Sequence, residues 1–334
     1  MKVAVVGAGS MGGMHLDLLA GMDEVSGLLV VEADASRAAA AADRTGAVVV
    51  TLAEAVATAE AVVVATPPEF HALEVEAAVD AGIHVLCEKP LTDTLASSIA
   101  LTERIEREGA HVEVGFQRRH DPAFIAARDA IGGRLHLVRL TAHDPIFEPD
   151  PRPEPMPTVA PIFRDSSIHD FDMVRWLSGQ EVTDVFAEVG RRDGTRPDDP
   201  REIESAVVTM RLSQGALAVL DASWLQPSGY DIRIELLSEA SAVSAGMTDR
   251  TPMARSEGEA PADAWPGYLE RFEPAYRAEL TAFLACCRGI RPPRSTARDG
   301  LEAMRIAVAA TRSFTEGRRV ALDEIDGLMR REVA

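Results

Sequence analysis

The sequence predicts an α/β protein: an N-terminal doubly wound parallel sheet, then an α+β domain whose open sheet is mostly antiparallel. Short apolar runs alternate with Ala-rich helical stretches in the first third of the chain. Such continuous runs are typical of parallel strands that helices cover on both faces. The periodicity changes near residue 120, and a length of 334 residues suits about two domains. We therefore expect one domain over residues 1–120 and a second over residues 121–334.

The first domain is expected to contain six strands, each followed by a helical stretch or a turn. Because a crossover helix returns the chain to the same edge of the sheet, these strands are expected to run parallel. The predicted strands are Val3–Val6, Leu28–Val31, Val48–Val50, Ala61–Ala65, Ile83–Cys87 and His111–Phe116. The predicted helices are Met11–Ala20, Ser36–Arg44, Glu54–Ala59, Glu69–Ala81 and Thr94–Glu108.

The second domain mixes helices with strands that alternate polar and apolar residues or are joined by short turns, which favours an antiparallel sheet. The segment Asp144–Pro161 holds seven prolines, so we expect an extended loop there, and the polar stretch Thr248–Pro266 is expected to be irregular. The predicted helices are Ala123–Ile131, Ser166–Leu177, Pro274–Arg288 and Thr296–Glu316, of which the last two are expected to pack back on the first domain. The predicted strands are Leu135–Ala142, Val182–Val189, Ser205–Leu212, Ala216–Ala222, Ile232–Leu237 and Ala242–Ala245.

Charge and composition exclude several classes of function. The chain has 34 Lys and Arg against 53 Asp and Glu, a net charge of −19, which argues against a nucleic-acid partner. No apolar run approaches the ~20 residues of a membrane span, and the N-terminal residues do not resemble a signal peptide. The three cysteines have no metal-type spacing. We therefore expect a cytoplasmic protein in a reducing compartment, with neither a membrane nor a metal ion.

A glycine-rich motif follows the first predicted strand. Residues Gly7-Ala8-Gly9-Ser10-Met11-Gly12 read G-x-G-x-x-G and open the first predicted helix. In this pattern the first glycine permits a tight turn, the second lets the backbone approach a pyrophosphate, and the third lets the helix pack against the strand. The helix start also presents N–H groups to phosphates. The motif predicts a Rossmann-type cradle for a dinucleotide, formed by Gly7, Gly9, Ser10, Met11 and Gly12.

An acidic residue, Glu32, ends the second predicted strand, where such folds place the ribose ligand. A carboxylate there accepts hydrogen bonds from the ribose hydroxyls and repels a 2′-phosphate. Glu32 therefore predicts NAD as the cofactor rather than NADP. Two neighbouring residues leave alternatives open. Asp34 is a second candidate for the ribose ligand, and Arg37 could bind the 2′-phosphate of NADP.

Two further motifs follow the fourth and fifth predicted strands. The first is Ala65-Thr66-Pro67-Pro68 with His71, and the second is Cys87-Glu88-Lys89-Pro90. Open α/β sheets bind ligands at the carboxyl ends of their strands, and Pro90 restrains Lys89 toward an extended conformation. Taken singly, Lys89 also fits a solvated surface lysine and Glu88 an acid that precedes a helix.

Asp165 and His169 lie four residues apart at the start of a predicted helix. This spacing places both side chains on the same side of the helix. Asp165 also fits the N-cap position, and His169 an ordinary polar site. A histidine titrates near neutral pH and can accept a substrate proton, so spacing alone leaves a structural and a catalytic interpretation open.

Taken together, these segments resemble the Gfo/Idh/MocA oxidoreductases, and the motifs are most similar to the inositol 2-dehydrogenase branch. The resemblance covers nearly the whole chain. It rests on the glycine motif, on Ala65-Thr66-Pro67 with His71, on Ala81–Leu91, on Gly115–Arg119 and on Asp165–Gly179. It implies a Rossmann domain that binds NAD and a second α/β domain whose open sheet forms an oligomer interface.

The resemblance also implies one site with residues from both domains. Its catalytic residues would be Lys89, Asp165 and His169. In this interpretation His169 accepts the hydroxyl proton, Asp165 orients the imidazole or relays the proton, and Lys89 stabilises the developing alkoxide. Besides the glycine motif, the cofactor would contact Glu32, Thr66, Pro67, His71 and Glu88. The substrate would contact Gln117, Arg118, Asp172 and Tyr230, although packing at a strand edge is an alternative role for Tyr230.

The leading hypothesis is an NAD-dependent oxidoreductase that transfers a hydride from a secondary alcohol of an inositol-like cyclic polyol or sugar to the nicotinamide. Two alternatives share the fold: an NAD-dependent glycoside hydrolase and a non-enzymatic NAD-binding regulator. A regulator has no use for Lys89, Asp165 and His169 together, which weighs against it. The expected partners are a small polyol or sugar and further copies of this chain, in a dimer or tetramer.

Overall fold

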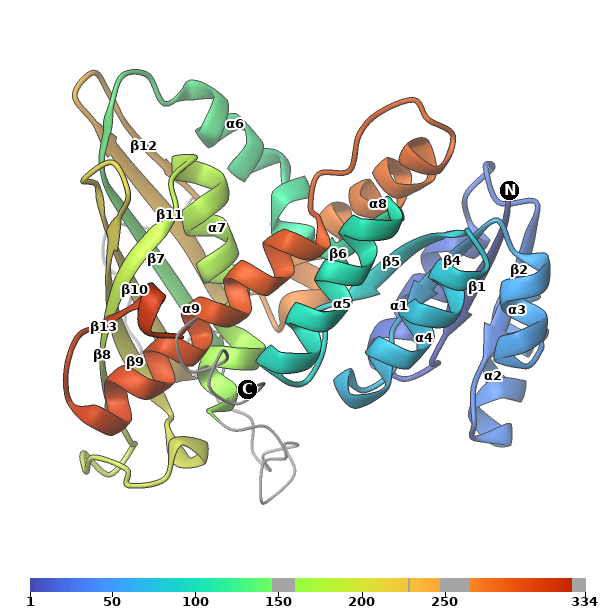
Figure 1. Ribbon diagram of the computed structural model, residues 1–334, viewed down its shortest axis with the longest axis horizontal. Helices are drawn as coiled ribbons and strands as arrows, with labels where there is room; N and C mark the ends of the chain where they lie inside the picture. The colour runs from blue at the N-terminus through green and yellow to red at the C-terminus, as the bar shows by residue number, and fades with distance from the viewer. Residues whose placement is uncertain (146–159, 228, 247–264, 326–334) are drawn as a thin grey trace. The chain divides into compact units, whose positions relative to one another are not determined.

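The computed structural model describes residues 1–145, 160–227, 229–246 and 265–325. The chain divides into two compact units (Figure 1). Unit 1 comprises Met1–Gln117 and Tyr276–Glu302, and unit 2 comprises Arg118–Ala275 and Ala303–Ala334. Each unit is built on one sheet.

Unit 1 has a six-stranded sheet in the order β3-β2-β1-β4-β5-β6, and every neighbouring pair is parallel. This topology confirms the predicted doubly wound sheet. The strands are β1 (Lys2–Val6), β2 (Gly27–Val31), β3 (Val48–Val49), β4 (Ala61–Val64), β5 (His84–Glu88) and β6 (Val112–Gly115). The helices between them are α1 (Ser10–Ala20), α2 (Ala35–Thr45), α3 (Leu52–Thr58), α4 (Pro68–Asp80) and α5 (Leu95–Glu108).

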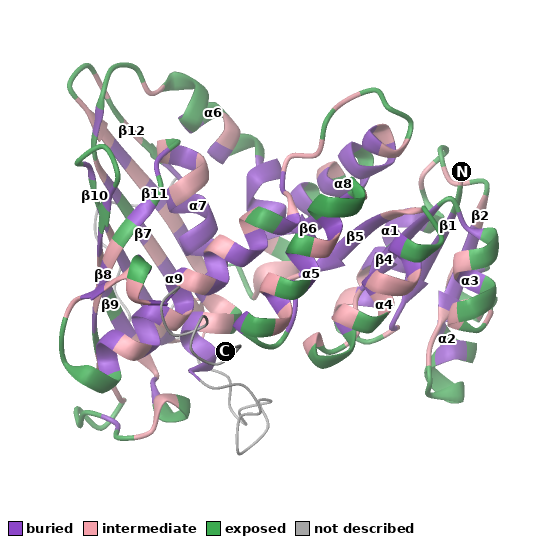
Figure 2. Ribbon diagram, viewed as in Figure 1, coloured by how far each residue is buried: buried purple, intermediate pink, exposed green. Residues whose placement is uncertain are grey.

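The central strands of unit 1 form its core (Figure 2). Residues Val3–Val6 and Ala61–Val64 are at most 2% exposed. Strands buried on both faces require helices on both faces; α1 packs with α2, whereas α4 packs with α3 and α5. The strand order reverses between β1 and β4, and open α/β sheets bind ligands at this point.

Unit 2 has a seven-stranded sheet in the order β12-β11-β7-β10-β9-β8-β13. Only β7 and β10 pair in parallel, and the other neighbouring pairs in this sheet are antiparallel. The prediction of a mostly antiparallel sheet is therefore confirmed. The strands are β7 (Leu135–Pro145), β8 (Val182–Gly190), β9 (Ser205–Leu212), β10 (Leu217–Gln226), β11 (Asp231–Ser238), β12 (Ala242–Ala245) and β13 (Val320–Ala321).

The helices of unit 2 lie along one face of this sheet, as Figure 1 shows for α7 (Ile168–Ser178). A further helix, α6 (Pro122–Ala130), packs near β12. In β9 the side chains alternate, so that Val208 and Met210 are buried while Val207 is 49% exposed. Leu217 of β10 is 50% exposed and lies on the same face as Val207, because Val207 pairs with Asp221 of the same strand. This face carries apolar side chains that the helices do not cover.

The structure differs from the sequence-based prediction at several boundaries. Helix α8 (Tyr268–Cys287) begins before Pro274, which lies inside it, and α9 (Ala297–Glu316) follows. Strand β7 continues through Asp144 and Pro145, where we expected a loop. Proline is tolerated there because it stands at the end of the strand. The rest of the proline-rich segment and residues 247–264 lie outside the described residues. Strand β13 has two residues, too few to give a periodic signal.

The described helices were also compared with the length and apolarity that a bilayer requires. None of them is long and apolar enough to cross a membrane.

Candidate active site

The glycine turn between β1 and α1 has the shape that a dinucleotide requires. Gly7 has a positive φ of 90°, and a Cβ on Gly12 would lie 2.0 Å from the carbonyl oxygen of Gly7. A Cβ on Gly9, in contrast, would meet nothing within 4 Å. Two of the glycines are therefore required by the fold, and the third leaves open space where a pyrophosphate can approach the backbone. Helix α1 starts at Ser10, so the N–H groups of its first turn point to this space.

Gly12→Ala is expected to lower the free energy of unfolding by about 1–3 kcal/mol, because the methyl group forces α1 away from β1. It should also weaken NAD binding, since the first turn of α1 moves with the helix. Gly9→Ala is the matched control: it should keep the melting temperature of the wild type and lose NAD affinity alone. Thermal unfolding and NAD titration check both variants. A Gly12→Ala protein with wild-type stability and NAD affinity would contradict this assignment.

Glu32 follows β2 and lies against the glycine turn. Its Oε2 accepts a hydrogen bond from the Ala8 N–H at 2.8 Å, and its Oε1 accepts from the Asp34 N–H at 2.9 Å and from Arg37 at 3.1 Å. Burial opposes ionisation, but the hydrogen bonds from Asp34, Ala8 and Arg37 outweigh it and lower the pKa of Glu32. The carboxylate is therefore charged and fixed next to the turn. A fixed negative charge at this position fits the ribose of NAD and disfavours a 2′-phosphate.

The turn that follows β4 contains Thr66 and Pro67. The Thr66 hydroxyl donates to Glu74 on α4 at 2.5 Å, and Pro67 precedes the first turn of α4. His71, on that first turn, is only 1% exposed. Its ring nitrogens lie 2.8 Å from the Thr66 carbonyl oxygen and 2.9 Å from the Pro90 carbonyl oxygen. The predicted contact of His71 with the cofactor stays a prediction; in the structure its two nitrogens face backbone carbonyls.

The turn that follows β5 carries Lys89, and its peptide bond to Pro90 is cis. Lys89 is partly exposed, whereas the preceding Glu88 is 5% exposed. Glu88 Oε1 lies 2.6 Å from Nε2 of His15, a fully buried residue of α1. Glu88 Oε2 also accepts the Lys89 N–H at 3.3 Å. Glu88 therefore anchors the lysine turn to the helix that begins at the glycine motif.

Glu279 of α8 is a buried acid near Glu88 and Glu113 in unit 1. Burial raises the pKa of Glu279, and the negative charges of Glu88 and Glu113 raise it further. Among the described residues, neither of its carboxylate oxygens has a hydrogen-bond partner. Burial and the neighbouring negative charges therefore favour the protonated form of Glu279. Neither Glu279 nor His15 was predicted, because neither residue belongs to a sequence motif.

Arg118, a predicted substrate ligand, is 4% exposed and lies in unit 2. It binds Asp170 of α7 at 2.6 Å, and Tyr230 is a further hydrogen-bond partner. Burial raises the pKa of Tyr230, and the carboxylates of Asp144 and Asp170 raise it further against the opposing charge of Arg118. The phenol is therefore neutral and able to donate a hydrogen bond. The structure thus brings together Arg118 and Tyr230, which were both predicted to contact the substrate.

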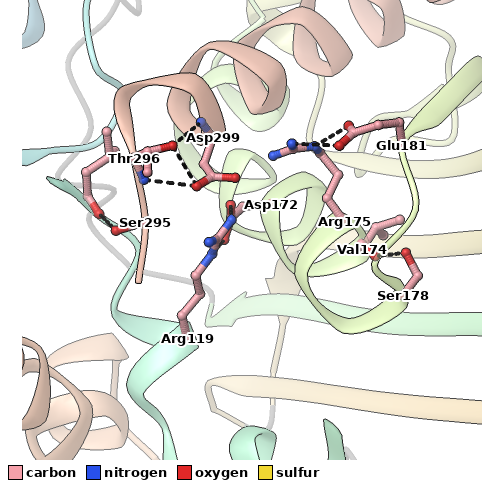
Figure 3. Close-up of polar contacts among 10 residues, drawn as sticks. Arg119, Asp172, Val174, Arg175, Ser178, Glu181, Ser295, Thr296 and Asp299 are labelled. Carbon is pink, nitrogen blue, oxygen red and sulfur yellow. Dashed lines mark hydrogen bonds and ion pairs between the residues drawn. The ribbon is translucent and has the colours of Figure 1, made fainter. Parts of the chain in front are cut away.

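Arg119 and Asp172 form a second buried ion pair, and Figure 3 shows the Arg119 side chain reaching Asp172. Nε of Arg119 donates to Oδ2 of Asp172 at 2.8 Å, and the terminal nitrogen donates to Oδ1 at 2.5 Å. Both side chains are at most 5% exposed. These two hydrogen bonds between Arg119 and Asp172 hold residues 118–120 against α7. Asp172 was predicted to bind substrate, and that role stays a prediction beside the ion pair that the structure shows.

Arg119→Met is expected to lower the free energy of unfolding by about 3–5 kcal/mol, because it leaves the Asp172 charge buried without its counter-ion. The double variant Arg119→Met with Asp172→Leu should recover most of this loss. Arg175→Met is the control: its partner Glu181 is 61% exposed, so the cost should be about 0–1 kcal/mol. Urea unfolding measures the free energy of unfolding of all three variants. Equal losses for Arg119→Met and Arg175→Met would refute the argument.

Asp165 and His169 flank the start of α7. Asp165 lies in a π-helical turn (Ile162–Ser166) and is exposed, whereas His169 lies on the first turn of α7 and is 9% exposed. The predicted N-cap role of Asp165 is wrong: the N-cap residue is Ser167, because the wider turn delays the start of the α-helix. The short sequence pattern gave no signal for this turn.

Gln117 ends unit 1 and begins a 3-10 turn, Gln117–His120. It is 2% exposed, and within the described part of the chain its Oε1 has no hydrogen-bond partner. A buried amide oxygen without a partner is costly unless a bound group satisfies it. This fits the predicted role of Gln117 as a ligand of a hydroxyl compound.

In residues 1–145, 160–227, 229–246 and 265–325, no three or more His, Cys, Asp or Glu side chains are arranged to hold a metal ion.

Comparison with known families matches both halves of the chain. Residues 1–116 match the Gfo/Idh/MocA family in its description "Oxidoreductase family, NAD-binding Rossmann fold", and residues 157–322 match its "C-terminal alpha/beta domain". Together the two matches cover most of the chain.

Curated relatives are similar over nearly the full length. Myo-inositol dehydrogenase Hyg17 of Streptomyces leeuwenhoekii is 39% identical over 329 residues, covering 95% of this chain and 98% of that protein. Inositol 2-dehydrogenase of Rhizobium meliloti is 31% identical and covers 96% of this chain and 99% of its own length.

Solved structures agree with the fold. A probable dehydrogenase from Thermotoga maritima has a TM-score of 0.87 at 29% identity, covering 97% of this chain and 99% of that one. A putative myo-inositol dehydrogenase from Sinorhizobium meliloti has a TM-score of 0.83 at 30% identity, with coverage of 96% and 99%.

Proposed function

This chain belongs to the Gfo/Idh/MocA family of NAD-binding oxidoreductases, and from that premise we propose that it is an NAD-dependent inositol dehydrogenase. It oxidises one secondary hydroxyl of an inositol-like cyclic polyol. The observation that carries the proposal is the 39% identity to a myo-inositol dehydrogenase over 95% of the chain. The fixed Glu32 carboxylate and the open space at Gly9 support NAD as the oxidant.

The proposed catalytic residues are Lys89, Asp165 and His169. Bound NAD supplies the hydride acceptor. The chain must then accept the hydroxyl proton and stabilise the negative charge that develops on oxygen. His169 accepts the proton, and Asp165 orients the imidazole or relays the proton to solvent. Lys89 donates a hydrogen bond to the reacting oxygen and stabilises its charge in the transition state.

The lysine content of the chain supports a chemical role for Lys89. The sequence contains two lysines, Lys2 and Lys89, so that 34 − 2 = 32 of its cationic side chains are arginines. An ammonium is a compact donor that can give up a proton, whereas a guanidinium stays charged and is much larger. Nearly all cationic side chains of this sequence are arginines, so a lysine at position 89 favours a function that requires an amine.

We propose that Gln117, Arg118 and Tyr230 contact the polyol, with Asp172 as a further predicted ligand. The buried Oε1 of Gln117, which has no partner among the described residues, accepts from one hydroxyl. The neutral Tyr230 phenol and the Arg118 guanidinium donate to others. A set with both donors and acceptors suits a ring of hydroxyl groups, each of which donates and accepts.

We further propose that residues 1–120 serve as the NAD-binding domain and residues 121–334 as the substrate and oligomerisation domain. The exposed Val207 and Leu217 on the face of the seven-stranded sheet that α7 does not cover support a dimer or tetramer through that face. We also propose a cytoplasmic location, where NAD and free inositol are both accessible.

The experiment that tests the proposal is the appearance of NADH absorbance with the purified full chain. Myo-inositol, scyllo-inositol and an aldose are each supplied with NAD or with NADP. The expected result is turnover of at least one inositol, with NAD preferred. No turnover over a full polyol panel would refute the proposal, as would cleavage of an aryl glycoside without net NADH, which would indicate a glycoside hydrolase.

A further inference from the structure

The imidazole of His71 lies between two turns at the carboxyl end of the parallel sheet. His71 Nε2 lies 2.8 Å from the Thr66 carbonyl oxygen, and Nδ1 lies 2.9 Å from the Pro90 carbonyl oxygen. Both distances are those of good hydrogen bonds. The ring is 1% exposed, so water does not compete for these contacts.

The two turns follow neighbouring strands. Strands β4 and β5 are paired in register from Ala61–His84 to Val64–Cys87, and Thr66 and Pro90 lie just beyond their carboxyl ends. Pro90 is bonded directly to Lys89. The Pro90 carbonyl belongs to the peptide that joins Pro90 to Leu91, so the imidazole contacts the lysine turn one residue beyond Lys89. Its other nitrogen faces the turn that precedes α4.

The His71 ring also lies next to a thiol, which packs against it and carries no charge. Cys87 Sγ lies 3.4 Å from His71 Nδ1. Cys87 is fully buried, and burial raises its pKa well above the usual value. The thiol is therefore neutral, and the strong acceptors that face the ring are the backbone carbonyls of Thr66, Pro90 and Leu91.

We propose that His71 is a positioning residue for catalysis, which ties the turn of Lys89 and Pro90 to the first turn of α4 by donating a hydrogen bond to the Pro90 carbonyl. The inference rests on the proposed function, in which Lys89 binds the reacting oxygen. It differs from the predicted role of His71 as a cofactor ligand, because His71 acts through the backbone of the lysine turn. Small displacements of a catalytic group can cost about 10²-fold in rate, so a loosened lysine turn should be visible in kcat.

The two hydrogen bonds can be separated by substitution. A neutral imidazole donates from one nitrogen only, so the two carbonyls compete for its proton. In His71→Asn the side-chain amide nitrogen replaces Nδ1 and can still donate to Pro90. In His71→Gln it replaces Nε2 and can donate to Thr66 instead. His71→Leu removes both donors and keeps an apolar side chain.

The experiment compares these variants by polyol kinetics, NAD affinity, melting temperature and backbone hydrogen exchange of residues 86–93. His84→Asn is the control, because His84 lies at the opposite end of β5 with its ring against His111. We expect His71→Asn to keep within about threefold of the wild-type kcat. His71→Gln and His71→Leu should lose about 10–100-fold, with little change in KM or NAD affinity and faster exchange in residues 86–93.

Two results would overturn the inference. The first is equal kinetics and equal exchange in the wild type and all three variants. The second is a loss in His71→Asn as large as in His71→Gln, because the Pro90 bond would then not be the one that matters. If the wild type shows no polyol turnover, the proposed function fails, and the hydrogen-exchange data alone test the positioning role of His71. Faster exchange in His71→Gln and His71→Leu, but not in His71→Asn, supports that role. Any other order of exchange rates overturns it.

Discussion

His169→Ala is expected to lower kcat for polyol oxidation by about 10²–10⁴-fold, the usual contribution of a general base. NAD affinity should change little, because the proposed cofactor ligands are the glycine turn and Glu32. Steady-state kinetics and NAD titration measure the two effects separately. A histidine is proposed for this role because its ordinary pKa lies near the operating pH.

The control for this variant is His136→Ala, which removes an exposed histidine from β7 in the same unit. It should keep full activity. The melting temperature of His169→Ala must also be measured, since His169 is 9% exposed. A correctly folded His169→Ala enzyme with more than about a tenth of the wild-type kcat would exclude His169 as the general base.

Lys89→Met is expected to lower kcat by about 10²–10³-fold, because methionine keeps the apolar stem and removes the donor that stabilises the developing alkoxide. Lys89→Arg should not restore the rate, since the guanidinium is larger and cannot give up its proton. The loss should fall on kcat more than on KM, as expected for an interaction formed in the transition state.

The chain supplies a matched control in Lys2, its other lysine, which is exposed at the start of β1. Lys2→Met should retain wild-type kcat and KM. Wild-type turnover in Lys89→Met, or full rescue by Lys89→Arg, would show that a positive charge or an apolar stem is sufficient at this position.

Local signals in the sequence predicted the parallel sheet and its glycine turn. The G-x-G-x-x-G motif constrains backbone geometry within six residues, and the Cβ of Gly12 would lie 2.0 Å from the Gly7 oxygen. The continuous apolar runs of β1 and β4 likewise report burial on both faces. The turn and the buried strands depend on residues that are close together in the sequence, so one sequence is enough to predict them.

The polar contacts that organise the site could not be predicted in the same way. Arg118 binds Asp170 and Arg119 binds Asp172 across more than 50 residues of chain. In the sequence, two adjacent arginines and two acids in a helix look like solvated charges. Their pairing follows from tertiary packing, which brings residues 118–120 against α7. The same limit applies to His15 with Glu88, and to His71 with Pro90.

The start of α7 shows a third kind of limit. The sequence predicted a helix from Ser166, with an N-cap as the structural alternative for Asp165, but a π-helical turn precedes Ser167 instead. Residues 146–159, which lead into this turn, are outside the described part of the chain. A change of helix type alters which side chains share a face, and no residue pattern in Asp165–Phe171 indicates it.

Direct hydride transfer from a cyclic polyol to NAD is the central claim, and deuterium tracing measures it. The full chain is incubated with NAD and myo-inositol deuterated at its ring carbons, and the reduced cofactor is analysed by mass spectrometry and NMR. We expect one deuterium at C4 of the dihydronicotinamide for each inositol oxidised, and a rate of deuterium transfer about 10²–10⁴-fold lower in His169→Ala. Reduced cofactor without deuterium, or consumption of a glycoside with NAD unchanged, would contradict it.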